Sequence, residues 1–153
     1  MFANVDLANA EARGEILRWL SWLGRTLRLG GIRFDATKHI SKAFQRELMA
    51  HVRGDEALRR WLVVGEYWHL DASFMAHLID DQFAGEMALF DIPLVHAFRD
   101  FSEAPEHRAD LRRILDSSLG RLRPDHSVVS SQSPGFLATK IALLIAHVSS
   151  LSS

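Results

Sequence analysis

Four side chains that could bind a metal fall on one stripe when residues 55–90 are placed on an α-helix. They are separated by three or eleven residues, and eleven residues make about three full turns. The four are Glu66, His69, His77 and Asp80. Imidazole and carboxylate groups suit zinc, iron or manganese, so the spacing predicts a site for a divalent metal. Two outer candidate ligands follow nearby, Asp81 and His96.

The same stripe has a second interpretation, because every amphipathic helix has a solvated polar face. The two interpretations differ in one testable respect. A metal site requires one continuous helix whose polar stripe faces the protein interior, together with further ligands from a second helix. A solvated face requires neither.

Two short motifs in this stretch resemble metal-binding elements of known families. Glu66-x-x-His69 resembles the Glu-x-x-His element of ferritin-like di-iron bundles, in which two helices each supply one such motif. This chain contains one. The run Asp80-Asp81-Gln82-Phe83, with Glu86 following, resembles the aspartate-rich motif of bacterial terpene cyclases, which implies Mg²⁺ held against a diphosphate. The second metal-binding motif of that family has no match downstream.

Glycine and proline signals predict about six helices joined by short connections. The expected helices cover residues 6–30, 36–52 and 55–90, a short stretch after Pro93, then 102–119, with Ser102 as its cap, and 134–148. Residues 30–37 are expected to form a connector without a sheet. The predicted fold class is therefore all-α, a compact antiparallel bundle-like single domain over residues 1–153, with 149–153 as a frayed tail.

Composition excludes several classes of protein. The chain has 153 residues, of which 48% are hydrophobic and 24% charged, and these values are typical of one globular domain. It has no cysteine, which excludes disulfides, thiol catalysis and iron–sulfur clusters. Neither a signal peptide nor an apolar stretch of membrane-spanning length is visible, so a soluble cytoplasmic protein is expected.

Charge is segregated along the chain although the net charge is only −1. Residues 13–38 carry six basic and two acidic residues, whereas residues 66–100 carry one basic and seven acidic residues. The acidic segment disfavours nucleic-acid binding, and membrane-surface contact by the first helix is not expected. A protein partner or self-association fits better. The candidate interaction residues on the first helix are Arg18, Trp22, Arg25 and Arg28.

These observations favour a small helical interaction or regulatory module, capable of forming a homodimer through its apolar last helix. No strong catalytic motif is present, so an enzyme is not the favoured class. The alternative is a helical-bundle metalloprotein that uses the polar stripe. A third hypothesis is a pocket for an apolar small ligand, lined by the aromatic side chains of Trp61, Trp68, Phe74 and Phe98.

Overall fold

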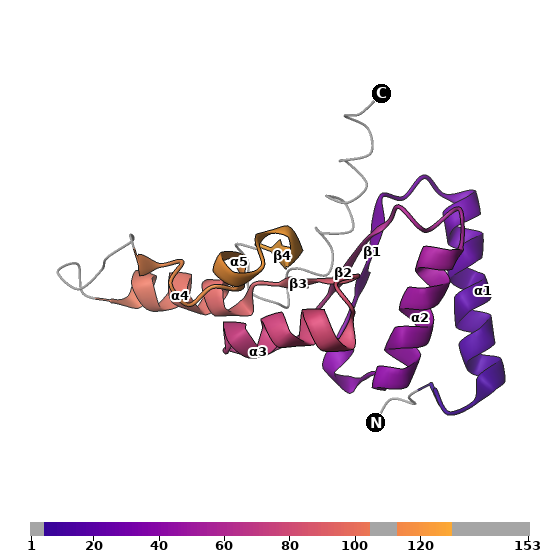
Figure 1. Cartoon of the computed structure of the whole chain (residues 1–153), viewed down its shortest axis with the longest axis horizontal. Helices are drawn as coiled ribbons and strands as arrows, with labels where there is room; N and C mark the ends of the chain where they lie inside the picture. The colour runs from indigo at the N-terminus through magenta and orange to yellow at the C-terminus, as the bar shows by residue number, and fades with distance from the viewer. Residues whose placement is uncertain (1–4, 105–112, 130–153) are drawn as a thin grey trace.

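A four-stranded parallel sheet organises the chain, as the computed structural model shows for residues 5–104 and 113–129 (Figure 1). Its strands follow the order β1-β2-β3-β4, and each neighbouring pair is parallel. They are β1 (Gly31–Phe34), β2 (Leu62–Gly65), β3 (Ala88–Phe90) and β4 (Ser127–Val128). Parallel neighbours require crossover connections, which the helices supply. The predicted all-α bundle is therefore wrong, and the expected connector over residues 30–37 contains the first strand.

Helices precede or connect these strands. The α-helices are α1 (Ala10–Thr26), α2 (Lys42–Gly54), α3 (Ala72–His77), α4 (Ile92–Glu103) and α5 (Leu119–Leu122). Short 3₁₀ turns cover Thr37–His39 and Pro124–His126, and a π-helical turn, Leu78–Gln82, continues α3. The helix expected after Pro93 is confirmed as α4. The helix expected over residues 134–148 and the tail lie outside the described residues.

The long helix expected over residues 55–90 does not exist. The run Leu62–Gly65 contains two valines that are both almost fully buried, as is typical of a parallel strand covered on both faces. A loop follows, and Asp71 then caps α3 by accepting hydrogen bonds from the backbone of Ser73 and Phe74. After the π-helical turn the chain enters β3. The apolar residues that suggested one continuous helix belong to three different elements, β2, α3 and β3.

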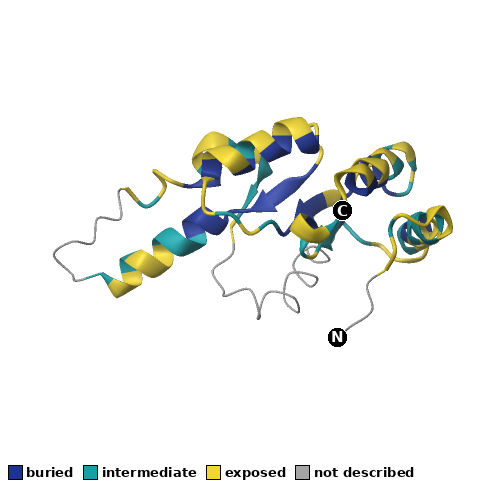
Figure 2. Cartoon of the chain, turned by 90° about the horizontal axis from the view of Figure 1, so that it is seen from below, coloured by how far each residue is buried: buried dark blue, intermediate teal, exposed yellow. Residues whose placement is uncertain are grey.

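The two faces of the sheet are covered differently. A large apolar cluster joins Val63 and Leu89 to buried residues of α1, α2, α3 and α5, such as Leu20 and Leu48. Within the described part of the chain, the smaller cluster on the opposite face is built from strand residues, and its only helical member is Ile92 at the start of α4. The strands are buried at the centre while the outer faces of the helices are exposed (Figure 2). The helices that connect the strands therefore lie mainly on one side of the sheet.

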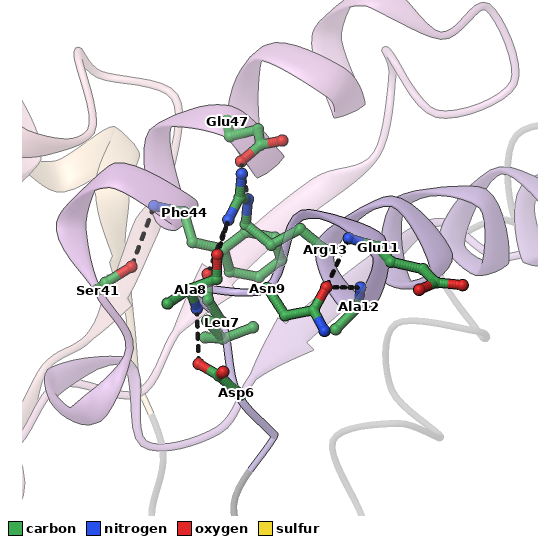
Figure 3. Close-up of polar contacts among 10 residues, drawn as sticks. All are labelled: Asp6, Leu7, Ala8, Asn9, Glu11, Ala12, Arg13, Ser41, Phe44 and Glu47. Atoms are coloured by element: carbon green, nitrogen blue, oxygen red, sulfur yellow. Dashed lines mark hydrogen bonds and ion pairs between the residues drawn. The ribbon is translucent and has the colours of Figure 1, made fainter.

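The N-terminal helix is joined to α2 by polar contacts at its first turn (Figure 3). Asn9 caps α1 by accepting from the backbone N–H groups of Glu11 and Ala12. Arg13 forms an ion pair with Glu47 on α2, with 2.9 Å between nitrogen and oxygen. The Arg13 guanidinium also donates to the backbone carbonyls of residues 7 and 8. These contacts hold the segment that leads into α1 against the helix that follows β1.

Candidate active site

Two carboxylates lie side by side at the carboxyl ends of neighbouring strands. Asp35 follows the last residue of β1, and Glu66 follows the last residue of β2. The register pairs Phe34 with Gly65, and the Glu66 N–H donates to the Phe34 carbonyl at 2.9 Å. Parallel strands end at the same edge of a sheet, so this register places the two acidic side chains together. In open and closed α/β folds this edge is where ligands bind.

One guanidinium nitrogen joins the two carboxylates. Nη2 of Arg33 donates to Oδ1 of Asp35 at 2.6 Å and to Oε2 of Glu66 at 2.8 Å. The two acceptor oxygens therefore cannot be farther apart than the sum of these two distances. The Arg33 guanidinium also lies over the Phe90 ring in a cation–π contact, with its central carbon 5.9 Å from the ring centre.

The surroundings of the two carboxylates differ sharply. The Asp35 side chain is 73% exposed, whereas that of Glu66 is 10% exposed. Oε1 of Glu66 accepts a hydrogen bond from the indole Nε1 of Trp68 at 3.1 Å, while Oε2 faces Arg33 and the backbone N–H of Ala36. One carboxylate is thus open to solvent, and the other is buried and held by donors on both oxygens.

The Asp35 carboxylate is held in its ionised form. A hydrogen bond with the Glu66 carboxyl group is the main cause that lowers the pKa of Asp35; burial opposes it, and the positive charge and hydrogen bond of Arg33 lower the pKa further. A carboxylate kept ionised in this way is able to act as a nucleophile.

The loop after β1 holds the Glu66 backbone. Ala36 adopts a left-handed conformation with φ 47°, which is uncommon for a residue other than glycine. This turn lets the N–H and the hydroxyl of Thr37 both donate to the Glu66 carbonyl, at 3.0 and 2.7 Å. Backbone strain of the kind seen at Ala36 is concentrated at functional loops.

A buried amide network supports this loop from below. Nε2 of Gln45, on α2, donates to the carbonyl oxygens of Thr37 at 2.6 Å and Ile40 at 2.7 Å. Oε1 of Gln45 accepts from Nε2 of Gln82 at 2.7 Å. Both glutamines are buried. The contacts run from the π-helical turn through α2 to the loop that anchors Glu66, so the site is built on the packed core.

The residues predicted to bind a metal are separated in the structure. Glu66 lies in the site described above, His69 stacks on Phe74 with ring centres 4.2 Å apart, and His77 pairs with Asp81 at 2.6 Å. Asp80 pairs with an arginine, Arg123, and His96 lies on α4. In residues 5–104 and 113–129, no group of three or more histidine, cysteine or acidic side chains is arranged to hold a metal ion. The stripe required a helix that is not present.

The residues predicted to bind a protein partner lie on α1 and just beyond its end. Of the expected interaction residues, Arg18 pairs with Glu15, Arg25 pairs with Asp55, and Trp22 is 55% exposed. Arg28, exposed, lies beyond the end of α1. Their role in binding a partner stays a prediction.

The four aromatic residues predicted to line a pocket differ in burial, and their role in binding a ligand stays a prediction. Trp61 is buried, whereas Trp68, Phe74 and Phe98 are exposed. An apolar cavity of about 260 Å³ lies elsewhere, between the start of α1, the end of β1 and α2. Its lining includes Ile16, Phe34, Phe44, Leu48 and Met87.

Asp35 and Arg33 were not identified as site residues from the sequence, because both lie in the segment expected to be a connector. A usable signal is present nevertheless. Three short segments each end in an acidic residue: Ile32-Arg33-Phe34 ends at Asp35, and two apolar runs end at Glu66 and Asp91. Three strands of a parallel sheet that end in this way bring their acidic residues to the same edge.

Comparison with known proteins gives consistent similarity to one kind of enzyme. The chain is 31% identical to an alpha-amylase of Bacillus licheniformis over 124 residues, which are 81% of this chain and 24% of that protein. It is 32% identical to the cytoplasmic alpha-amylase of Escherichia coli K12 over 128 residues, 84% of this chain and 25% of that protein. It is 29% identical to the glucan 1,4-alpha-maltohexaosidase of Bacillus sp. strain 707, again over 84% of this chain and 24% of that protein.

The chain thus spans about a quarter of the length of the curated relatives it matches. No protein-family model matches it. These similarities overturn the predicted interaction or regulatory module, since the matched relatives are glycoside hydrolases and the sheet is parallel. Within residues 5–104 and 113–129, no helix combines the length and the apolar character needed to cross a membrane.

Proposed function

We propose that this chain carries the catalytic carboxylate pair of an enzyme that hydrolyses α-glucans. The observation that carries the proposal is the Asp35–Arg33–Glu66 arrangement at the carboxyl ends of β1 and β2. Glycosidases use a pair of carboxyl groups on either side of the scissile bond, one as an acid and one as a nucleophile or base. The similarity to enzymes named alpha-amylase and maltohexaosidase supports an α-linked glucan as the substrate.

The different surroundings of the two carboxyl groups assign their roles. Asp35 is exposed and ionised, as a nucleophile must be. Glu66 is buried and accepts a hydrogen bond on each of its two oxygens, and we assign it the role of the general acid. In the first step the Asp35 carboxylate forms a bond to the anomeric carbon while Glu66 protonates the departing glycosidic oxygen. In the second step Glu66 accepts a proton from water while the water oxygen bonds to the anomeric carbon and the bond to Asp35 breaks, which regenerates both carboxyl groups.

The separation of the pair supports a retaining reaction. Carboxyl groups lie about 5–5.5 Å apart in retaining glycosidases and about 6.5–9.5 Å apart in inverting ones, which need room for a water molecule. Two oxygens that accept from the same Arg33 nitrogen at 2.6 and 2.8 Å cannot lie farther apart than the sum of these distances, which is less than the separation in inverting enzymes. We therefore expect the product sugar to keep the α configuration.

The arrangement of strands and helices supports a (β/α)₈ barrel as the fold to which these strands belong. The strands follow one another in sequence order, and the connecting helices pack mainly on one face. A doubly wound sheet would reverse its strand order and carry helices on both faces. In a barrel, catalytic residues come from the carboxyl ends of several strands, as Asp35 and Glu66 do.

Hydrolysis of maltohexaose by the purified chain tests the proposal. New reducing ends are measured for the unaltered chain and for Asp35→Asn and Glu66→Gln, which remove one carboxylate each at nearly constant shape. We expect either variant to lose at least about a hundredfold in rate, because each removes a group that acts in bond cleavage. Asp71→Asn, which changes a nearby helix cap, is the matched control. Equal rates in all four proteins, or no hydrolysis by the unaltered chain, would contradict the proposal.

We also propose that the protein acts in the cytoplasm. The similarity to the cytoplasmic alpha-amylase of Escherichia coli supports this location. Cell fractionation followed by immunodetection of the chain tests it, and recovery from the culture medium or the periplasm would contradict it.

A further inference from the structure

Trp68 contacts the buried carboxyl group directly. Its indole Nε1 donates to Oε1 of Glu66 at 3.1 Å, while Arg33 donates to the other oxygen, Oε2, at 2.8 Å. Donors on two different oxygens fix the plane of a carboxyl group, whereas a donor on one oxygen leaves it free to turn about its last bond. The orientation of a general acid decides whether its proton reaches the leaving oxygen.

The loop that carries Trp68 is itself held in place. Nδ1 of His69 accepts a hydrogen bond from the backbone N–H of Asp71 at 3.1 Å, and the His69 ring stacks on Phe74 of α3. From this loop the Trp68 indole N–H reaches Glu66. It is nevertheless 36% exposed, so burial of its ring alone does not explain its place at the site.

We propose that Trp68 is a positioning residue for Glu66, whose indole N–H acts together with Arg33 to hold the acid in the plane required for proton donation. This inference rests on the proposed role of Glu66 as the general acid. A purely structural role for Trp68 would affect folding and every substrate equally. A positioning role affects only reactions in which the leaving group needs a proton.

The contact can be tested without catalysis, by NMR titration of the indole N–H signals of the chain labelled with ¹⁵N. The chain has four tryptophans, and the Trp68 signal is assigned by its loss in Trp68→Phe. We expect this signal to shift with pH at the same midpoint as the Glu66 carboxyl carbon, and the inflection to disappear in Glu66→Gln. Asp71→Asn controls for the other nearby carboxylate. A Trp68 signal that titrates identically in Glu66→Gln overturns the proposal.

Leaving-group dependence tests the consequence for the reaction. Maltohexaose needs a proton on its departing oxygen, whereas α-maltosyl fluoride releases fluoride with little help from an acid. We expect Trp68→Phe to lower kcat on maltohexaose about tenfold and kcat on the fluoride less than about twofold, a fraction of what a general acid contributes. Trp22→Phe, which removes an exposed indole on α1, is the matched control.

The outcomes separate the two proposals. Equal losses on both substrates overturn the positioning role of Trp68 while leaving the carboxylate pair intact. No hydrolysis of either substrate by the unaltered chain contradicts the proposed function, and the NMR titration then decides the Trp68–Glu66 contact by itself.

Discussion

Replacement of Asp91 by alanine should be among the most destabilising single changes in this chain. Asp91 follows β3 and is completely buried. Its Oδ1 accepts from the backbone N–H groups of Leu94 and Leu119, at 2.9 and 3.0 Å, and Oδ2 accepts from the N–H of Gly120 at 2.8 Å and the Ser127 hydroxyl at 3.1 Å. One carboxylate thus joins the first turns of α4 and α5 to the start of β4.

The magnitude follows from the donors left behind. A buried donor without an acceptor costs about 1–3 kcal/mol, and Asp91→Ala leaves three backbone N–H groups in this state, so the expected loss is about 3–5 kcal/mol after partial relief by water. Asp91→Asn keeps the acceptor for two N–H groups and should cost about 1–3 kcal/mol. Ser127→Ala removes one donor and should cost about 1 kcal/mol. A whole domain is stable by only about 5–15 kcal/mol.

Urea denaturation followed by far-ultraviolet circular dichroism measures these differences at constant m-value. The expected order of stability is unaltered chain, Ser127→Ala, Asp91→Asn, Asp91→Ala. A free energy of unfolding for Asp91→Ala within about 1 kcal/mol of the unaltered chain would refute the account of buried donors.

Three further predictions test other parts of the structure. Gly31→Ala places a Cβ 2.2 Å from a backbone carbonyl oxygen of β2 and should lower the melting temperature strongly. Gly54→Ala, whose added Cβ meets no atom within 4 Å, should leave the melting temperature unchanged or raise it. Similar melting temperatures for the two variants would contradict this expectation. Gln45→Leu leaves two loop carbonyl groups without their hydrogen-bond donor. We expect the free energy of unfolding in urea to fall by about 2–4 kcal/mol and the hydrolysis rate to decrease. An unchanged rate would show that the catalytic loop does not depend on Gln45. A hydrogen bond from Ser21 holds the pKa of Asp55 below its ordinary value. The resulting contribution to stability is complete above about pH 4 and is lost as the pH falls further. Ser21→Ala should make the free energy of unfolding depend less steeply on pH in this acid range, and an equally steep dependence would count against the prediction.

Some elements of the fold could be predicted from the sequence because local signals specify them. The first helix was predicted over residues 6–30, and the structure forms it over Ala10–Thr26 with Asn9 as its cap. The helix after Pro93 was predicted from proline at its first turn and its apolar face. These signals act within a few residues, so tertiary contacts do not alter them.

The sheet could not be predicted by the same reasoning, because its strands are very short. The run Leu62–Gly65 has four residues, and both of its faces are covered, so it lacks the alternation of apolar and polar residues that marks a half-exposed strand. A short apolar run cannot be distinguished from buried helix by periodicity alone. Continuing the helical pattern through this run gave a helix of implausible length and placed Glu66 and His77 on a common stripe.

Only one of the two carboxylates of the site was identified from the sequence, for the same reason. Glu66 was singled out for its chemistry, but its actual partner, Asp35, lies on another strand 31 positions away in sequence. Only the parallel register of β1 and β2 brings the two together. A spacing rule that works within one helix cannot detect a pair assembled by a crossover connection.

Covalent trapping of the nucleophile tests the central claim most directly. A maltosyl fluoride carrying fluorine on its ring forms a glycosyl–enzyme bond quickly and hydrolyses slowly, so the intermediate of a retaining enzyme accumulates. After incubation, proteolysis and mass spectrometry should locate one added sugar on the peptide that contains Asp35, with no label in Asp35→Asn. Labelling at another carboxylate, or turnover with inversion of configuration and no labelled peptide, would contradict the assignment of Asp35 and Glu66 as nucleophile and acid.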